Sequence, residues 1–190
     1  MKRKAKELVR CSWAGEGAMA VYHDSEWGVP TRDSRKLYEF LVLELSQAGL
    51  SWSTILKKRE GYARAFSHWD IDLVAAYSAE KEAQLLQDPS IVRNKLKVAA
   101  AVENARVLVK MRDEEQLSFA DYLWAFLPDG KPVVRQAGAP CASKTPLSDR
   151  ISKDMKKRGF RFVGSTTVYS LLQSCGLVDD HDSTCWKRNT

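Results

Sequence analysis

The cysteines and histidines of this 190-residue chain are concentrated at its two ends. Cys11 and His23 lie near the N-terminus, and His181 and Cys185 lie near the C-terminus, out of only four cysteines and three histidines. Two thiolates and two imidazoles make a complete tetrahedral ligand set for structural zinc. Such a site would join the two ends of one domain. The spacing of Cys11 and His23 matches no common zinc-finger pattern, so free thiols and surface histidines remain the alternative.

Composition limits the class of protein. The chain is 44% hydrophobic, as in a globular protein, and no stretch approaches the roughly 20 apolar residues of a membrane span. The basic start lacks the apolar segment of a secretory signal, so we expect a cytoplasmic protein with no membrane association. We expect residues 1–10 to form a basic, flexible tail and residues 11–190 to form a single unit. The net charge of +6 favours a polyanionic partner.

Helical patterns and capping signals recur along the chain, and no sustained period-two alternation appears. We expect helices over residues 34–48, 51–66, 78–87, 95–110, 119–126, 148–158 and 165–175. A proline-rich loop is expected between residues 128 and 147. The prediction is an all-α fold in one compact domain. In a two-lobed version of it, the two terminal segments would form a second lobe beside the central helices.

An acidic residue interrupts the apolar face of the helix predicted over residues 34–48. Glu44 falls on the face that carries Leu37, Leu41 and Leu45. A carboxylate there is costly without a partner, so Glu44 is either a satisfied ion pair or a functional group in a cleft. Aromatic residues occur in the same part of the chain: Trp13, Tyr22, Trp27 and Trp52. They predict a core or, together with one acidic group, a pocket that stacks an electron-poor base.

A short turn at Ser90, Ile91 and Val92 joins two predicted helices. The second helix begins among basic residues: Arg93, Lys95 and Lys97. This order is typical of a helix-hairpin-helix, in which turn amides and the next helix N-terminus bind a DNA phosphate. The turn lacks the two glycines usual in that motif, so an ordinary pair of helices is the alternative.

Several unusual blocks of sequence resemble the bacterial 3-methyladenine DNA glycosylase I family, from about Cys11 to Cys185. They are YHDSEWGVP at 22–30, QAGLSW at 47–52, LKKRE at 56–60, KKRGFRFVG at 156–164 and CGLVDDH at 175–181. The resemblance implies the all-α helix-hairpin-helix DNA glycosylase fold. It also implies one structural Zn²⁺ per chain, held by Cys11, His23, His181 and Cys185, which would join the N- and C-terminal segments.

The resemblance further implies a reaction on double-stranded DNA that contains alkylated bases. The enzyme flips 3-methyladenine out of the duplex, hydrolyses its N-glycosidic bond and leaves an abasic site, with 3-methyladenine as the product. Glu44 would recognise the base edge rather than act as a conventional acid, because the alkylated base is already a good leaving group. Trp52 would stack on the base. The remaining pocket walls would be formed by Tyr22, Trp27 and Trp13.

The same resemblance places Gly49 and Leu50 at the pocket mouth, with Leu50 as a wedge in the base stack. No lysine nucleophile is implied, so we expect a monofunctional glycosylase without lyase activity. We also expect the protein to be a monomer. A bifunctional glycosylase/lyase is the nearer alternative. A zinc-stabilised helical protein that binds DNA or senses lesions without catalysis is the alternative from another class. Such a protein would not need a base pocket.

Overall fold

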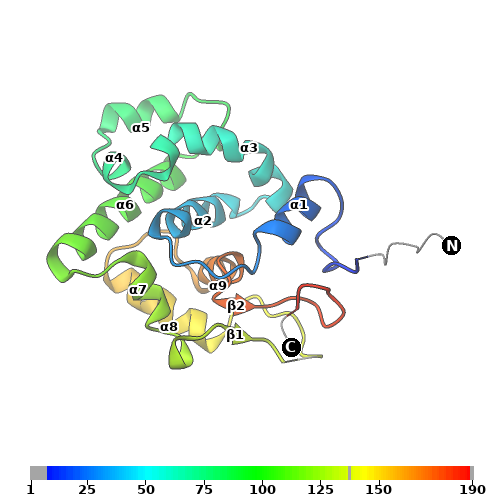
Figure 1. Ribbon diagram of the computed structural model, residues 1–190. Helices are drawn as coiled ribbons and strands as arrows, with labels where there is room; N and C mark the ends of the chain where they lie inside the picture. Colours follow the sequence, from blue (N-terminus) through cyan, green and yellow to red (C-terminus); the bar gives the residue numbers. More distant parts are fainter. Residues whose placement is uncertain (1–7, 137, 189–190) are drawn as a thin grey trace.

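The computed structural model describes residues 8–136 and 138–188 (Figure 1). Its α-helices within these residues are α1 (Ala18–Ser25), α2 (Ser34–Gln47), α3 (Trp52–Ala65), α4 (Ile71–Ala75), α5 (Ala79–Leu85), α6 (Lys95–Glu115), α7 (Phe119–Trp124), α8 (Pro146–Lys157) and α9 (Ser165–Ser174). Strands β1 (Val133–Val134) and β2 (Val178–Asp179) pair in parallel, with Val133 opposite Val178. This small pair is the only sheet in the described part of the chain, so the all-α prediction is confirmed.

Helix α2 is the central helix of the fold. It contacts α3, α6, α7 and α9, and in Figure 1 it lies between α3–α6 on one side and α7–α9 on the other. Asp33 caps its N-terminus by accepting a hydrogen bond from the Arg35 amide. Every residue from Leu37 to Ser46 is buried. Because neighbours surround the helix, even its polar side chains near the C-terminus face the interior.

Local capping chemistry sets most of the helix boundaries. The side chains of Ser51, Ser78, Asn94 and Ser118 each accept a hydrogen bond from a backbone amide in the first turn of the following helix. Helix α8 begins earlier than predicted, because Thr145 and Ser148 form a capping box around Pro146. Helices α1 and α4 were not predicted; both are short. No helix within the described ranges is long and apolar enough to cross a membrane.

The first and last described segments of the chain lie side by side. The Trp186 amide donates to the Val9 carbonyl at 2.9 Å, and the Ser12 amide donates to the Asp182 carboxylate at 2.8 Å. Arg10, which we placed in the tail, pairs with Asp24 at 2.7 Å. Residues 1–7 of that predicted tail lie outside the described residues. The contacts show that the terminal segments pack together, as a shared metal site would require.

Candidate active site

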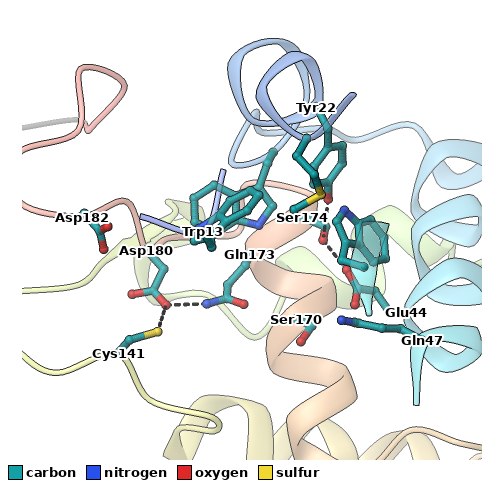
Figure 2. A pocket seen from close by; sticks show the side chains of 13 residues that line it. Trp13, Tyr22, Glu44, Gln47, Cys141, Ser170, Gln173, Ser174, Asp180 and Asp182 are labelled. Atoms are coloured by element: carbon teal, nitrogen blue, oxygen red, sulfur yellow. Dashed lines mark hydrogen bonds between the residues drawn. The ribbon is translucent and has the colours of Figure 1, made fainter. Parts of the chain in front are cut away.

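A cavity of about 290 Å³ opens between α1, α2, α3 and α9. The five residues predicted to form the base pocket all line it: Trp13, Tyr22, Trp27, Glu44 and Trp52. They come from three helices, α1, α2 and α3, and from two turns, all within the first 52 residues of the chain. Figure 2 shows Glu44 and Ser174 pointing toward one another at one end, with Asp180 and Cys141 at the other.

Glu44 lies on the last turn of α2 with its side chain in the cavity wall. The residue is only 6% exposed. The Ser174 hydroxyl, from α9, donates to Glu44 Oε1 at 2.5 Å, and the Tyr22 hydroxyl donates to Ser174 Oγ at 3.1 Å. Burial raises the pKa of Glu44 to about 7, and the Ser174 hydrogen bond acts in the opposite direction. The pocket therefore holds a carboxyl group whose pKa lies near neutral pH.

The aromatic residues form one wall of the cavity. The rings of Tyr22 and Trp52 lie 5.2 Å apart at 48°, and those of Trp13 and Trp27 lie 4.8 Å apart at 73°. The indole Nε1 of Trp52 is buried and has no hydrogen-bond partner among the described residues.

The opposite end of the cavity was missed by the sequence analysis. It is formed by Gln173, Asp180 and Asp182, together with Cys141 from the long loop. Asp180 accepts hydrogen bonds from the Tyr169 hydroxyl at 3.0 Å and from the Gln173 amide. No local pattern distinguishes these residues, because they approach the pocket only when the loop at 128–147 packs against the C-terminal segment.

Three of the four predicted metal ligands are gathered in one buried cluster. Candidate ligand atoms of Cys11, His23 and Cys185 lie within 4.8 Å of one another. His181 lies beside this group, with its ring centroid 5.3 Å from that of His23. His181 Nε2 is buried without a hydrogen-bond partner in the described part of the chain. Burial raises the pKa of the Cys11 thiol to about 12, as expected for a buried thiol without a cation beside it.

The cysteine–histidine cluster formed by Cys11, His23, His181 and Cys185 is in direct contact with the aromatic wall. The Trp27 ring lies 4.6 Å from the His181 ring, and the Trp13 ring lies 5.4 Å from the His23 ring. Gly28 makes this approach feasible, because a Cβ at that position would lie 2.5 Å from the His181 ring. The cluster therefore supports the wall of the cavity from behind.

In the turn at residues 90–92, which was predicted to bind phosphate, the backbone amides donate hydrogen bonds within the protein. The Ser90 amide donates to the Asp88 carboxylate at 2.7 Å, and the Val92 amide donates to the Tyr62 hydroxyl at 3.2 Å. Ile91 is only 2% exposed. These contacts do not fit the predicted phosphate contact, because the turn amides already have partners. Arg93 and Lys95 remain exposed next to the turn.

Lys97 also differs from its predicted role. It is 8% exposed, and its ammonium group donates to the carbonyl oxygens of Ser46 and Ala48. This ammonium cannot reach a phosphate at the surface while it holds these two carbonyls. Gly49 and Leu50, which follow directly, are exposed and lie in the sequence between the cavity-lining residues Gln47 and Trp52. The wedge role of Leu50 stays a prediction.

A second helix-hairpin-helix candidate lies between α8 and α9. Gly159 has φ +98°, and Gly164 is the N-cap of α9 without a side-chain cap. Asn104 on α6 fixes the turn between them, since it accepts from the Arg161 amide at 2.7 Å and donates to the Arg161 carbonyl at 3.1 Å. The uncapped first amides of α9 are left for an outside acceptor. Two glycines that bracket an apolar turn, preceded by KKR, were the signal in the sequence.

A helical fold that surrounds a buried carboxylate with aromatic rings, beside basic turns, has the features of a DNA glycosylase that takes a base into a pocket. The chain belongs to the methyladenine glycosylase family, which it matches over residues 13–188.

Two curated relatives cover nearly the whole chain. It is 45% identical over 181 residues to DNA-3-methyladenine glycosylase 1 of Escherichia coli (strain K12), covering 94% of this chain and 96% of the relative. It is 42% identical over 179 residues to DNA-3-methyladenine glycosylase of Haemophilus influenzae (strain ATCC 51907 / DSM 11121 / KW20 / Rd), covering 93% and 96%.

Solved structures share the fold. A crystal structure of 3-methyladenine DNA glycosylase I superimposes with a TM-score of 0.91 at 45% identity, covering 95% of this chain and 100% of that chain. A structure that describes 3-methyladenine recognition by the Staphylococcus aureus enzyme gives 0.90 at 34% identity, covering 97% and 99%.

Proposed function

We propose that this protein is a DNA-repair glycosylase that excises 3-methyladenine from alkylated DNA. The observation that carries the proposal is Glu44, a buried carboxyl group in a cavity walled by Trp52 and Tyr22. Both curated relatives are named as DNA-3-methyladenine glycosylases, and a solved relative is a complex with 3-methyladenine. A cavity of about 290 Å³ is near the lower end of ligand pockets and suits one nucleobase.

The pocket residues favour a cationic adenine. An adenine methylated at N3 carries a positive charge while it is attached to the sugar, and that charge favours the ionised form of Glu44. The carboxylate then accepts hydrogen bonds from the adenine edge, while Trp52 stacks on the ring. Because the base leaves as a neutral molecule, these residues need to bind and orient it and to exclude competing bases, rather than protonate it strongly.

The cavity favours simple hydrolysis over lyase chemistry. A lyase needs an amine that forms a Schiff base with the sugar. None of the described residues that line the cavity is a lysine. The proposed enzyme is a monofunctional glycosylase that leaves an abasic site.

The DNA-binding surface combines the pocket mouth with the turn between α8 and α9. Leu50 is 41% exposed at the end of α2, where it can enter the space left by a flipped base. The amides at the start of α9 hold a phosphate, and Lys157 and Arg161 beside them are exposed. Arg93 and Lys95 add positive charge at the start of α6. This surface contacts the backbone without reading sequence.

One Zn²⁺ per chain is held by Cys11, His23, His181 and Cys185. The donor set fits the metal, since the buried Nε2 of His181 has no partner among residues 8–136 and 138–188 and its Nδ1 contacts Asp179 at 2.8 Å. His23 Nδ1 contacts Asp24 in the same way. The metal supplies structural stabilisation only, by closing a loop that spans most of the chain. The two-lobed arrangement and the monomeric state stay predictions.

Calorimetry with free 3-methyladenine separates this function from a protein that only binds DNA. We expect the free base to bind, and unmodified adenine to bind more weakly. A protein that contacts only the DNA backbone would bind neither. Borohydride trapping on methylated DNA tests the lyase alternative, since a covalent protein–DNA adduct would contradict a monofunctional enzyme.

A further inference from the structure

Lys97 is a buried lysine that binds the C-terminal end of α2. Its Nζ donates to Ser46 O at 2.9 Å and to Ala48 O at 2.6 Å. No carboxylate pairs with it within residues 8–136 and 138–188, and burial lowers its pKa. A buried ammonium group without an anionic partner is costly, so its position needs a specific reason.

The carbonyl oxygens of Ser46 and Ala48 belong to a segment that contains both residues of the cavity and Leu50, the proposed wedge. Glu44 lies one half-turn before Ser46, Gln47 lines the cavity, and Leu50 follows directly. The last carbonyls of a helix lack partners within the helix and carry partial negative charge. Lys97 supplies the donors that they lack. It thereby fixes the direction in which the chain leaves α2.

Lys97 also connects this segment to the basic surface of the protein. It lies in the first turn of α6, whose N-terminus is capped by Asn94. Lys95, two residues earlier, is exposed and has no bonding partner in the described part of the chain. Within one helical turn, Lys95 therefore faces solvent and Lys97 binds the segment that leads to Leu50.

We propose that Lys97 is a positioning residue for base extrusion, which holds the carbonyl oxygens of Ser46 and Ala48 so that Leu50 is directed into the base stack. The inference rests on the proposed function. Without the ammonium group, the exposed residues 48–51 lose their anchor to α6, and Leu50 is no longer held ready to fill the gap in the stack. The pocket itself keeps Glu44, Trp52 and Ser174.

The experiment compares Lys97→Met, which keeps the length of the side chain without its donors, with Lys95→Met. Release of 3-methyladenine is measured in single turnover from methylated duplex and from methylated single-stranded DNA, which has no intact base stack to open. For Lys97→Met we expect release from duplex to fall about tenfold and release from single strands to change by less than about twofold. Affinity for the free base and the salt dependence of duplex binding should stay as in the wild type.

Lys95→Met should behave in the opposite way. It should weaken duplex binding and lower its salt slope by up to about one unit. Equal loss of release by Lys97→Met on both substrates would overturn the inference, as would no loss on either. If Lys97→Met does not fold, Lys97→Gln, which keeps one donor, is measured with the same substrates and the same criterion. A wild-type protein that releases nothing from either substrate would contradict the proposed function instead.

Discussion

Ser174 donates a hydrogen bond of 2.5 Å to Glu44 from a position 130 residues further along the chain. The bond joins the last turn of α9 to the last turn of α2. It engages Oε1, and in the proposed function the other oxygen, Oε2, accepts from the base. Tyr22 extends the chain of donors from α1, and three helices thereby orient one carboxyl group.

Replacing Ser174 by alanine tests this arrangement. The Ser174 hydroxyl stabilises the charged form of Glu44, so its loss should raise the pKa of Glu44 further and leave the carboxyl less firmly oriented. We expect free 3-methyladenine to bind about 1 kcal/mol more weakly in calorimetry. Ser170→Ala is the matched control, since Ser170 also lies on α9 and lines the cavity but makes no hydrogen bond to Glu44 in the described part of the chain. Equal effects of the two changes would contradict a specific role for Ser174.

Glu44 should also make stability depend on pH. Its pKa is raised from 4.5 to about 7 by burial, so the folded protein binds more protons there than the unfolded chain between these values. The stabilisation is complete below pH 4.5 and is lost as the pH rises toward 7, and it amounts to roughly 3 kcal/mol.

Glu44→Gln cannot ionise and should lack this dependence. The free energy of unfolding, measured in urea at pH 5 and pH 8, should therefore fall more steeply with pH in the wild type than in the variant. A difference between the two proteins that is the same at both pH values would show that Glu44 does not titrate abnormally.

The cysteine–histidine cluster should stabilise the pocket as well as the fold. Cys185→Ser should lose zinc, melt at a lower temperature and bind free 3-methyladenine more weakly, because Trp27 and Trp13 pack against the histidines of the cluster. Elemental analysis, thermal melting and calorimetry measure these three effects. Cys141→Ser is the control for zinc content and melting temperature, since Cys141 is exposed and lies outside the cluster. Protein purified without chelators that contains no zinc would contradict the metal site.

The turn between α8 and α9 should carry more of the DNA affinity than the turn at Ser90. Arg161→Gln should weaken duplex binding and lower the slope of log K against log salt by up to about one unit. Free-base affinity should not change. Lys110→Gln removes an exposed charge from the other end of α6 and should have little effect on either quantity. If Arg161→Gln binds duplex like the wild type at moderate salt, this turn does not contact phosphate.

Local signals predicted the helices better than the contacts between them. Ser51 and Ser118 act as caps where expected, because a cap depends only on the next few residues. Glu44 was identified because helical periodicity shows which side chains face inward. Its partner Ser174 was missed, since a contact between α2 and α9 leaves no mark on the local sequence of either helix.

The turn at Ser90 and the turn between α8 and α9 also show that local sequence does not reveal contacts between distant segments. The turn at Ser90 was predicted to bind phosphate from its basic neighbours, although the structure uses its amides internally through Asp88 and Tyr62. The turn between Gly159 and Gly164 had the glycine spacing but was interpreted as a helix end. Charge in the sequence does not show which direction a side chain takes, and Lys95 and Lys97 illustrate this within one helical turn.

The most direct test of the account is to incubate the protein with methylated duplex DNA and to identify the released bases by chromatography. We expect release of 3-methyladenine and none of 7-methylguanine, since guanine presents a carbonyl oxygen toward Glu44 where adenine presents an amine. Glu44→Gln should fold normally and release 3-methyladenine more slowly, with about 1–3 kcal/mol lost in free-base binding. Release of both bases at similar rates, or an unchanged rate in folded Glu44→Gln, would contradict recognition of the base by Glu44.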